Sequence, residues 1–190
     1  MSDKLLVLLP EVVAAVPVPV VASGGFASGA SLVAALALGA QGIHCGTAFL
    51  ATEESFAHDV HKQKVVAARA TDTVYTDVFA INWPPRSPVR VIANALTTQF
   101  QGPLLGHGPA DFEREVIAWE GDRPIYKFST DSPLRTTTGD LESLPAFAGQ
   151  VAGSLHEIPT AGQRLERMVR EAEATLERLG RRARGDPTTP

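Results

Sequence analysis

The sequence has a single cysteine, no excess of basic residues and no long apolar run. Cys45 is the only thiol among 190 residues, so no disulfide can form within the chain, and we expect a reducing, cytoplasmic setting. The 17 basic and 21 acidic residues give a formal net charge of -4, which argues against a nucleic-acid partner. Because no run of about 18 apolar residues occurs, no membrane span is expected.

Two common site motifs are also absent. The stretch from Gly24 to Gly29 does not fit the G-x-G-x-x-G fingerprint of a dinucleotide-binding fold. The nucleophile elbow Gly-x-Ser-x-Gly does not occur either, so no Ser-His-Asp hydrolase is indicated.

The N-terminal residues allow two interpretations. Lys4 followed by Leu5–Leu9 resembles the start of a secretory signal, but Asp3 precedes this run and Pro10 interrupts it. We favour a helix that ends before Pro17. Its apolar face consists of Leu6, Leu9, Val12, Val13 and Val16.

Two glycine turns, about 20 residues apart, are the most informative feature of the sequence. Ser23-Gly24-Gly25 follows the apolar run Val18–Ala22, and Gly46-Thr47 follows Ile43-His44-Cys45. Between them lies a predicted helix, Ala30–Leu38, with Ser28 as its N-cap and Gly39 just after its end.

This order predicts a βαβ unit. The continuous apolar character of the first strand favours a parallel strand that is covered on both faces. Backbone without a Cβ lets an anion approach the amides, and a helix N-terminus favours its charge. The two turns therefore predict a phosphate site, with ordinary ligand-free turns as the alternative.

Beyond Thr47 the pattern predicts an added α+β segment. We expect a helix from Thr52 to about Arg69, β-prone stretches at Thr73–Phe79 and Val89–Ala95, a helix around Asp111–Trp119 and polar loops through Asp140.

A long amphipathic helix is predicted near the end of the chain, with apolar residues at helical spacing from Leu165 to Leu179. We expect Gly180 to end this helix and residues 181–190 to form a frayed tail. Its solvated face is expected to hold Arg164, Glu166, Arg167, Arg170 and Glu171.

Three sets of residues carry a resemblance to a known family. They are Pro19–Gly25, Ala34–Ala40 and Gly46–Ser55, with further similarity at Thr71–Thr73 and Ala148–Gly153. On these residues the chain resembles the nitronate monooxygenase family, of the 2-nitropropane dioxygenase type, over nearly its whole length.

The resemblance implies a TIM barrel that binds flavin mononucleotide (FMN) and oxidises alkyl nitronates with O2 to a carbonyl compound and nitrite. By position, Gly25 matches the glycine that meets the flavin phosphate. His44-Cys45-Gly46-Thr47 matches the second run near the phosphate. The cofactor-binding set implied is Gly24, Gly25, His44, Cys45, Gly46 and Thr47.

The chain departs from the family pattern in three respects. It begins at the helix before the seventh barrel strand, so the resemblance places the catalytic histidine and most flavin-ring contacts in an upstream segment. Ala48 stands where many members have arginine, and His44 stands where glutamine is frequent. No catalytic residue is assigned within the chain.

Three functions stay open. The first is an FMN-dependent nitronate monooxygenase in which this chain holds the phosphate-binding part. The second is a truncated, inactive remnant or a fragment that requires a partner, and the third is a flavin-type enoyl reductase, whose barrel is similar.

The fold class expected is α/β, a partial TIM (β/α)8 barrel made of its last two βα units. We expect barrel strands and phosphate turns in residues 1–60, the α+β segment in 61–140, closing helices in 141–180 and a disordered tail in 181–190. A two-stranded parallel sheet has open edges. We therefore expect the chain to be unstable alone, to self-associate, or to need the missing N-terminal half.

The remaining histidines and the cysteine receive structural interpretations. His58 and His61 are one helical turn apart and could hold a metal, but no third ligand follows, so a solvated helix face is preferred. We expect His107 to lie in a flexible loop between glycines, and Cys45 to be a small buried hydrophobe.

Overall fold

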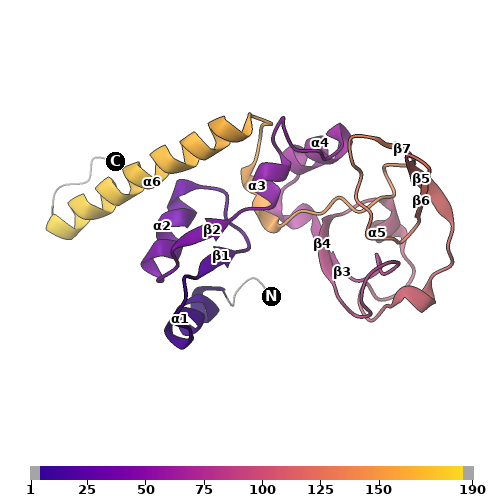
Figure 1. Ribbon diagram of the computed structural model, residues 1–190, viewed down its shortest axis with the longest axis horizontal. Helices are drawn as coiled ribbons and strands as arrows, with labels where there is room; N and C mark the ends of the chain where they lie inside the picture. Colours follow the sequence, from indigo (N-terminus) through magenta and orange to yellow (C-terminus); the bar gives the residue numbers. More distant parts are fainter. Residues whose placement is uncertain (1–4, 186–190) are drawn as a thin grey trace. The chain divides into compact units, whose positions relative to one another are not determined.

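The chain divides into two units in its computed structural model, which describes residues 5–185. The terminal unit comprises Met1–Phe49 and Pro159–Pro190, and the central unit comprises Leu50–Ile158. Each unit is described by itself below (Figure 1). No helix among residues 5–185 is long and apolar enough to cross a membrane.

The terminal unit is built around a parallel strand pair. Its elements are α1 (Leu5–Ala15), β1 (Val21–Ser23), α2 (Gly29–Ala37), β2 (Gly42–His44), α3 (Thr47–Leu50, whose last residue belongs to the central unit) and α6 (Ala161–Arg184). β1 pairs with β2 in parallel, with Val21 opposite Gly42 and Ser23 opposite His44. The predicted βαβ order is therefore confirmed, with α2 as the crossover helix.

Local sequence fixes both ends of α2. The Ser28 hydroxyl accepts a hydrogen bond from the Ser31 amide at 3.2 Å, and the Ser31 hydroxyl accepts one from the Ser28 amide at 3.1 Å. Gly39 follows the C-cap Leu38 with a φ of +93°, a left-handed conformation that glycine adopts without strain. The predicted N-cap and the predicted terminating glycine are both confirmed.

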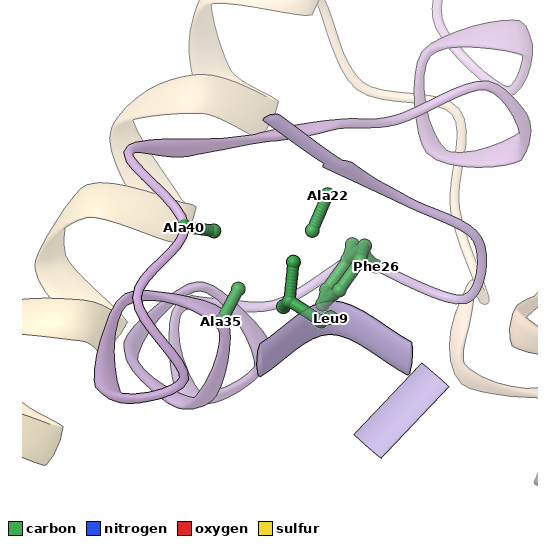
Figure 2. Packing of buried hydrophobic residues seen from close by; sticks show 5 residues of the cluster. All are labelled: Leu9, Ala22, Phe26, Ala35 and Ala40. Atoms are coloured by element: carbon green, nitrogen blue, oxygen red, sulfur yellow. The ribbon is translucent and has the colours of Figure 1, made fainter. Parts of the chain in front are cut away.

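The core of the terminal unit lies on one face of the strand pair. Leu9, Ala22, Phe26, Ala35 and Ala40 are buried, and Figure 2 shows their side chains turned toward one another. The expectation that the first strand is covered on both faces is wrong, because Val21, which points to the opposite face, is 57% exposed. A single layer of helices covers only one side of so small a sheet.

Helix α6 packs along α2 (Figure 1), and Gly29 lies directly against the backbone of α6. A Cβ built on Gly29 would lie 2.1 Å from the Ala172 amide nitrogen and 2.3 Å from the Met168 carbonyl oxygen. Since both atoms belong to the backbone of α6, they cannot rotate away as a side chain would. The lack of a side chain at Gly29 therefore allows the short distance between the two helices.

The predicted end of α6 at Gly180 is wrong. The helix continues to Arg184 and ends at Gly185, whose φ is +77°. One glycine inside a helix costs only about 1 kcal/mol. Basic residues in the last turn favour the extension, because they interact well with the helix C-terminus. The tail predicted for 181–190 is thus helical through Arg184, and residues 186–190 lie outside the described residues.

The central unit contains short helices and two antiparallel sheets. Its elements are α4 (Asp59–Ala67), β3 (Thr73–Thr76), β4 (Val89–Ile92), α5 (Ala95–Gln99), β5 (Val116–Glu120), β6 (Arg123–Tyr126) and β7 (Thr137–Gly139), with 3₁₀ turns at Ala70–Asp72, Pro109–Asp111 and Gln150–Ser154. β3 pairs with β4, and the second sheet has the order β6-β5-β7 (Figure 1). Two buried clusters support these sheets, one around Phe79 and Val91 and the other around Ala118 and Ile125.

Two helix predictions in the central unit are wrong. The helix expected around Asp111–Trp119 is largely the strand β5, because the β-prone residues of Val116–Glu120 pair on both sides with β6 and β7. The helix expected from Thr52 begins only at Asp59. Before it, Ala57 forms a bridge with Leu134, and the His58 amide donates to the Pro133 carbonyl oxygen at 3.0 Å, so extended pairing replaces the helix there. The polar stretch through Asp140 was predicted as loops, but it contains β6 and β7.

The close contact at Gly29 predicts a large effect of a single methyl group. We expect Gly29→Ala to destabilise the terminal unit by roughly 3 kcal/mol, because the backbone of α6 would have to move. Gly42→Ala is the matched control, since a Cβ there meets nothing within 4 Å and Gly42 has no positive φ. Urea unfolding of both variants measures the difference, and equal midpoints would contradict the role assigned to Gly29.

Candidate functional site

The two glycine turns leave the same end of the strand pair. Because Ser23 lies opposite His44 in a parallel register, the chain after β1 and the chain after β2 emerge side by side. The Ser23 hydroxyl and the His44 Nδ1 are 3.3 Å apart, which joins the two strand ends by a hydrogen bond. The turns predicted from sequence are therefore brought together in one place.

The backbone of the first turn requires glycine. Gly24 has a φ of +111° and Gly25 a φ of +82°, and side chains are strained in both conformations. A Cβ at Gly24, Gly25 or Gly46 would meet no atom within 4 Å, and all three residues are exposed. The space beside both turns is thus open within this unit, as the approach of a ligand to the backbone requires.

The N-terminus of α2 already has an acidic partner. The Gly29 amide donates to a carboxylate oxygen of Glu171 in α6 at 2.9 Å, so a negative charge of the chain itself lies at this positive helix end. An anion at the turns would therefore rely on the backbone of Gly24, Gly25, Gly46 and Thr47 rather than on the first amides of α2. Sequence reasoning missed Glu171, which it assigned only to a solvated face.

Two residues that flank the second turn face the core. Cys45 packs against the cluster around Leu9 and Ala22, and this burial raises the pKa of its thiol. The interpretation of Cys45 as a small hydrophobe agrees with this packing, although its side chain is only partly buried. Ala48 is fully buried, so the position at which the family often has arginine holds a small core residue here.

The histidines predicted on a solvated helix face lie elsewhere. His58 is the N-cap of α4, and its Nδ1 accepts a hydrogen bond from the Val60 amide at 3.1 Å. His61 is 1% exposed, and its Nε2 lies 3.0 Å from the Phe147 carbonyl oxygen. The solvated interpretation of His61 is therefore wrong. No group of three His, Cys, Asp or Glu side chains that could hold a metal occurs among residues 5–185.

Two other polar residues are more tightly held than their sequence suggested. His107 packs edge-on against Phe100, with ring centroids 5.3 Å apart, and its Nε2 lies 2.7 Å from the Pro103 carbonyl oxygen. Arg164, predicted on the solvated face of the last helix, is 4% exposed. Neither residue belongs to the turns.

The two turns together have features that an anion site requires. It offers exposed backbone at two turns, a hydroxyl and an imidazole that contact each other, and neighbouring helices that fix the strand ends. The Ser23–His44 contact is the hydrogen bond between side chains that the structure shows at these strand ends, and we assign it no catalytic role. A phosphate-bearing molecule is the ligand class that this arrangement fits.

The sequence profile of the nitronate monooxygenase family matches residues 2–171. The chain therefore belongs to this family. It is 51% identical over 177 residues to a probable nitronate monooxygenase of Staphylococcus haemolyticus, covering 89% of this chain and 43% of that protein. A probable nitronate monooxygenase of Bacillus subtilis is 47% identical over 167 residues, which cover 88% of this chain and 44% of that protein.

Solved structures share the α/β fold. A nitroalkane oxidase from Streptomyces ansochromogenes matches with a TM-score of 0.67 and 29% identity, covering 93% of this chain and 47% of that one. FabK from Thermotoga maritima matches with a TM-score of 0.65 and 28% identity, covering 92% of this chain and 50% of that one. The chain thus spans about half the length of these relatives, and residues 5–185 form no closed barrel.

The buried His61 makes the stability of the central unit depend on pH. Burial lowers the pKa of His61 to about 4, and the nearby Lys64 lowers it further, against the opposing effect of the Phe147 carbonyl. Because the unfolded chain takes up the proton near pH 6.5, stability is full above that pH and falls as the pH is lowered toward 4. A shift of this size corresponds to a loss of about 3 kcal/mol.

Unfolding experiments between pH 7 and pH 4 measure this loss, with His61→Gln as the comparison. Glutamine keeps a donor for the Phe147 carbonyl oxygen and does not titrate, so we expect the variant to lose most of the pH dependence in this window. An unchanged slope in the variant would assign the dependence to other groups.

Proposed function

We propose that this chain carries the phosphate-binding part of an FMN-dependent nitronate monooxygenase. The observation that carries the proposal is the pair of glycine turns at the same end of β1 and β2, in a chain of this family. In this proposal the terminal unit corresponds to the last two βα units of a TIM barrel. Alkyl nitronate and O2 are the substrates, and a carbonyl compound and nitrite are the products.

The residues of the turns fit the phosphate of FMN. The backbone amides of Gly24, Gly25, Gly46 and Thr47 would hold it, and the open space beside the glycines leaves room for its oxygens. His44, placed by its contact with Ser23, would add a polar side chain at the rim. FMN, when bound, supplies the oxidation of the nitronate.

In this proposal the residues of the two turns position the cofactor, and other parts of the enzyme carry out the chemistry. We assign no catalytic residue to the two turns. A separate polypeptide or an upstream segment would supply the flavin-ring contacts and the catalytic histidine. We propose a cytoplasmic location on the basis of the single, unpaired cysteine.

Two alternatives have observations in their favour. The similarity to FabK keeps a flavin-type enoyl reductase open as the activity of the whole enzyme. The exposed outer face of β1 favours an inactive remnant or a fragment that requires a partner, because Val21 lacks the cover that further strands would give.

Comparing FMN with riboflavin tests the proposed phosphate site. We expect the purified chain to bind FMN at least about tenfold more tightly than riboflavin, which has the same ring system without the phosphate. Fluorescence quenching of each flavin on titration with the chain measures the two affinities. A colourless chain that binds neither flavin would contradict the proposal for this polypeptide.

A pair of substitutions at Gly46 separates charge from shape. Gly46→Asp places a carboxylate beside the proposed phosphate and is expected to weaken FMN binding at least about tenfold, because like charges repel. Gly46→Ala is the matched control and should change binding little, since its Cβ would meet nothing within 4 Å and Gly46 has no positive φ. Equal FMN affinities for the two variants would argue against a phosphate at this turn.

A further inference from the structure

The strand pair and its crossover helix lack formal charges. Residues 12–52, which contain β1, both glycine turns, α2 and β2, include no Asp, Glu, Lys or Arg. His44 and Cys45 are the only titratable side chains in this stretch. Burial raises the pKa of the Cys45 thiol, so this thiol stays mostly protonated and neutral up to pH 8.5. His44 is therefore the side chain of the stretch that can become a cation near neutral pH.

His44 lies next to both glycine turns. It is the last residue of β2, its side chain is exposed, and Gly46 of the second turn follows two residues later. Its partner in the parallel register is Ser23, which directly precedes Gly24 of the first turn. An imidazole at this position is thus close to the backbone that would surround a phosphate.

The contact with Ser23 suits both protonation states of the imidazole ring. The Ser23 Oγ and the His44 Nδ1 are 3.3 Å apart. Because a hydroxyl both donates and accepts, it can donate to the Nδ1 of a neutral ring and accept from the Nδ1–H of a protonated ring. Within residues 5–185, the other ring nitrogen, Nε2, has no hydrogen-bond partner. Nε2 is therefore the ring atom that is left for a ligand.

The other charges around the strand pair stay constant near neutral pH. β1 and α2, which pack against β2, hold no charged residue, and the charged residue of α1 is the exposed Glu11. From α6, Glu171 places a carboxylate at the start of α2, and the arginines of this helix keep their charge well above pH 8.5. Among the elements around β2, His44 is thus the group whose charge changes between pH 7 and pH 8.5.

From these observations we propose that protonated His44 supplies the positive charge that holds the phosphate of FMN at the two turns. The proposal rests on the proposed function, because it concerns the same site. A phosphate monoester loses its second proton at about pH 6, so it carries two negative charges above pH 7. A hydrogen bond from an imidazolium to this dianion is charge-assisted, and such bonds are stronger than neutral ones.

Binding of the phosphate and protonation of His44 are then linked. The bound dianion stabilises the proton on the imidazole, so FMN binding takes up protons from solution. By the same linkage, the affinity for FMN falls as the pH rises and the imidazole loses its charge. A neutral His44 that served only as a polar contact would give neither effect.

Titration of the full chain with FMN at pH 7 and at pH 8.5 tests the proposal, with fluorescence quenching as the readout. We expect the affinity of the wild-type chain to fall about threefold over this interval, because the phosphate is a dianion at both pH values and the histidine loses its charge. Riboflavin, which has no phosphate, should show no such fall.

Two substitutions separate the charge of His44 from its ring. His44→Gln keeps a polar group beside Ser23 without a charge, so we expect FMN binding that is about threefold weaker at pH 7 and does not fall toward pH 8.5. His44→Lys is charged at both pH values, so at pH 8.5 it should bind FMN about threefold more tightly than the wild-type chain. His156→Gln is the matched control, since it removes an exposed histidine outside the strand pair and should keep the wild-type fall.

Proton uptake gives a second measure of the same linkage. Calorimetric titration with FMN at pH 7, in two buffers of different ionisation enthalpy, reports the number of protons taken up on binding. We expect roughly half a proton more for the wild-type chain than for His44→Gln. Circular dichroism establishes that all variants keep the fold.

The outcomes distinguish the role of His44 from the phosphate site itself. Equal pH dependence in the wild-type chain and in His44→Gln would overturn the role of His44, and so would a His44→Lys variant that binds FMN no better than His44→Gln at pH 8.5. In both cases, a preference for FMN over riboflavin would leave the proposed phosphate site standing. A chain that binds the two flavins equally, or neither of them, would contradict both proposals.

Discussion

The contact between the first turn of α2 and the backbone of α6 is the constraint on which the terminal unit depends. At Gly29 the helices touch without a side chain between them, and the amide of the same residue donates to Glu171. One residue thus combines close packing with a charge-assisted hydrogen bond, which is stronger than a neutral one. Since α2 starts only a few residues after Gly25, this contact also fixes the end of the first glycine turn.

Glu171 has a second effect, on the electrostatics of the candidate site. A carboxylate at the N-terminus of α2 offsets the partial positive charge that this helix end would offer an anion. In the proposed site, a phosphate would therefore be held through the amides of the turns themselves, and Gly24 and Gly25 adopt the positive φ angles of their turn without strain. Such a site would favour a small anion that several N–H donors can surround at close range.

Sequence reasoning succeeded where the determinants are local. Ser28 and Gly39 set the two ends of α2 through contacts within a few residues. The two strands and their turns were predictable from apolar runs and glycines. It failed where pairing between residues far apart in the sequence determines the secondary structure. Val116–Glu120 becomes a strand because β6 and β7 flank it, and the segment before Asp59 is held by Pro133 and Leu134.

The same limit applies to the candidate site and to the end of α6. Both turns were predicted, but the partner of Gly29 was not, since no local pattern links it to Glu171. The sequence predicted Gly180 as the end of α6, but the helix passes Gly180 because one glycine costs only about 1 kcal/mol, and it ends at Gly185.

The 142 positions that separate Gly29 from Glu171 also have a consequence for synthesis on the ribosome. α2 emerges long before α6, so its first turn stays without its packing partner while the whole central unit is being made. Closing so long a loop costs chain entropy, and a central unit that folds early would shorten the effective loop. The contact between α2 and α6 therefore cannot form until α6 has been synthesised, after the whole central unit.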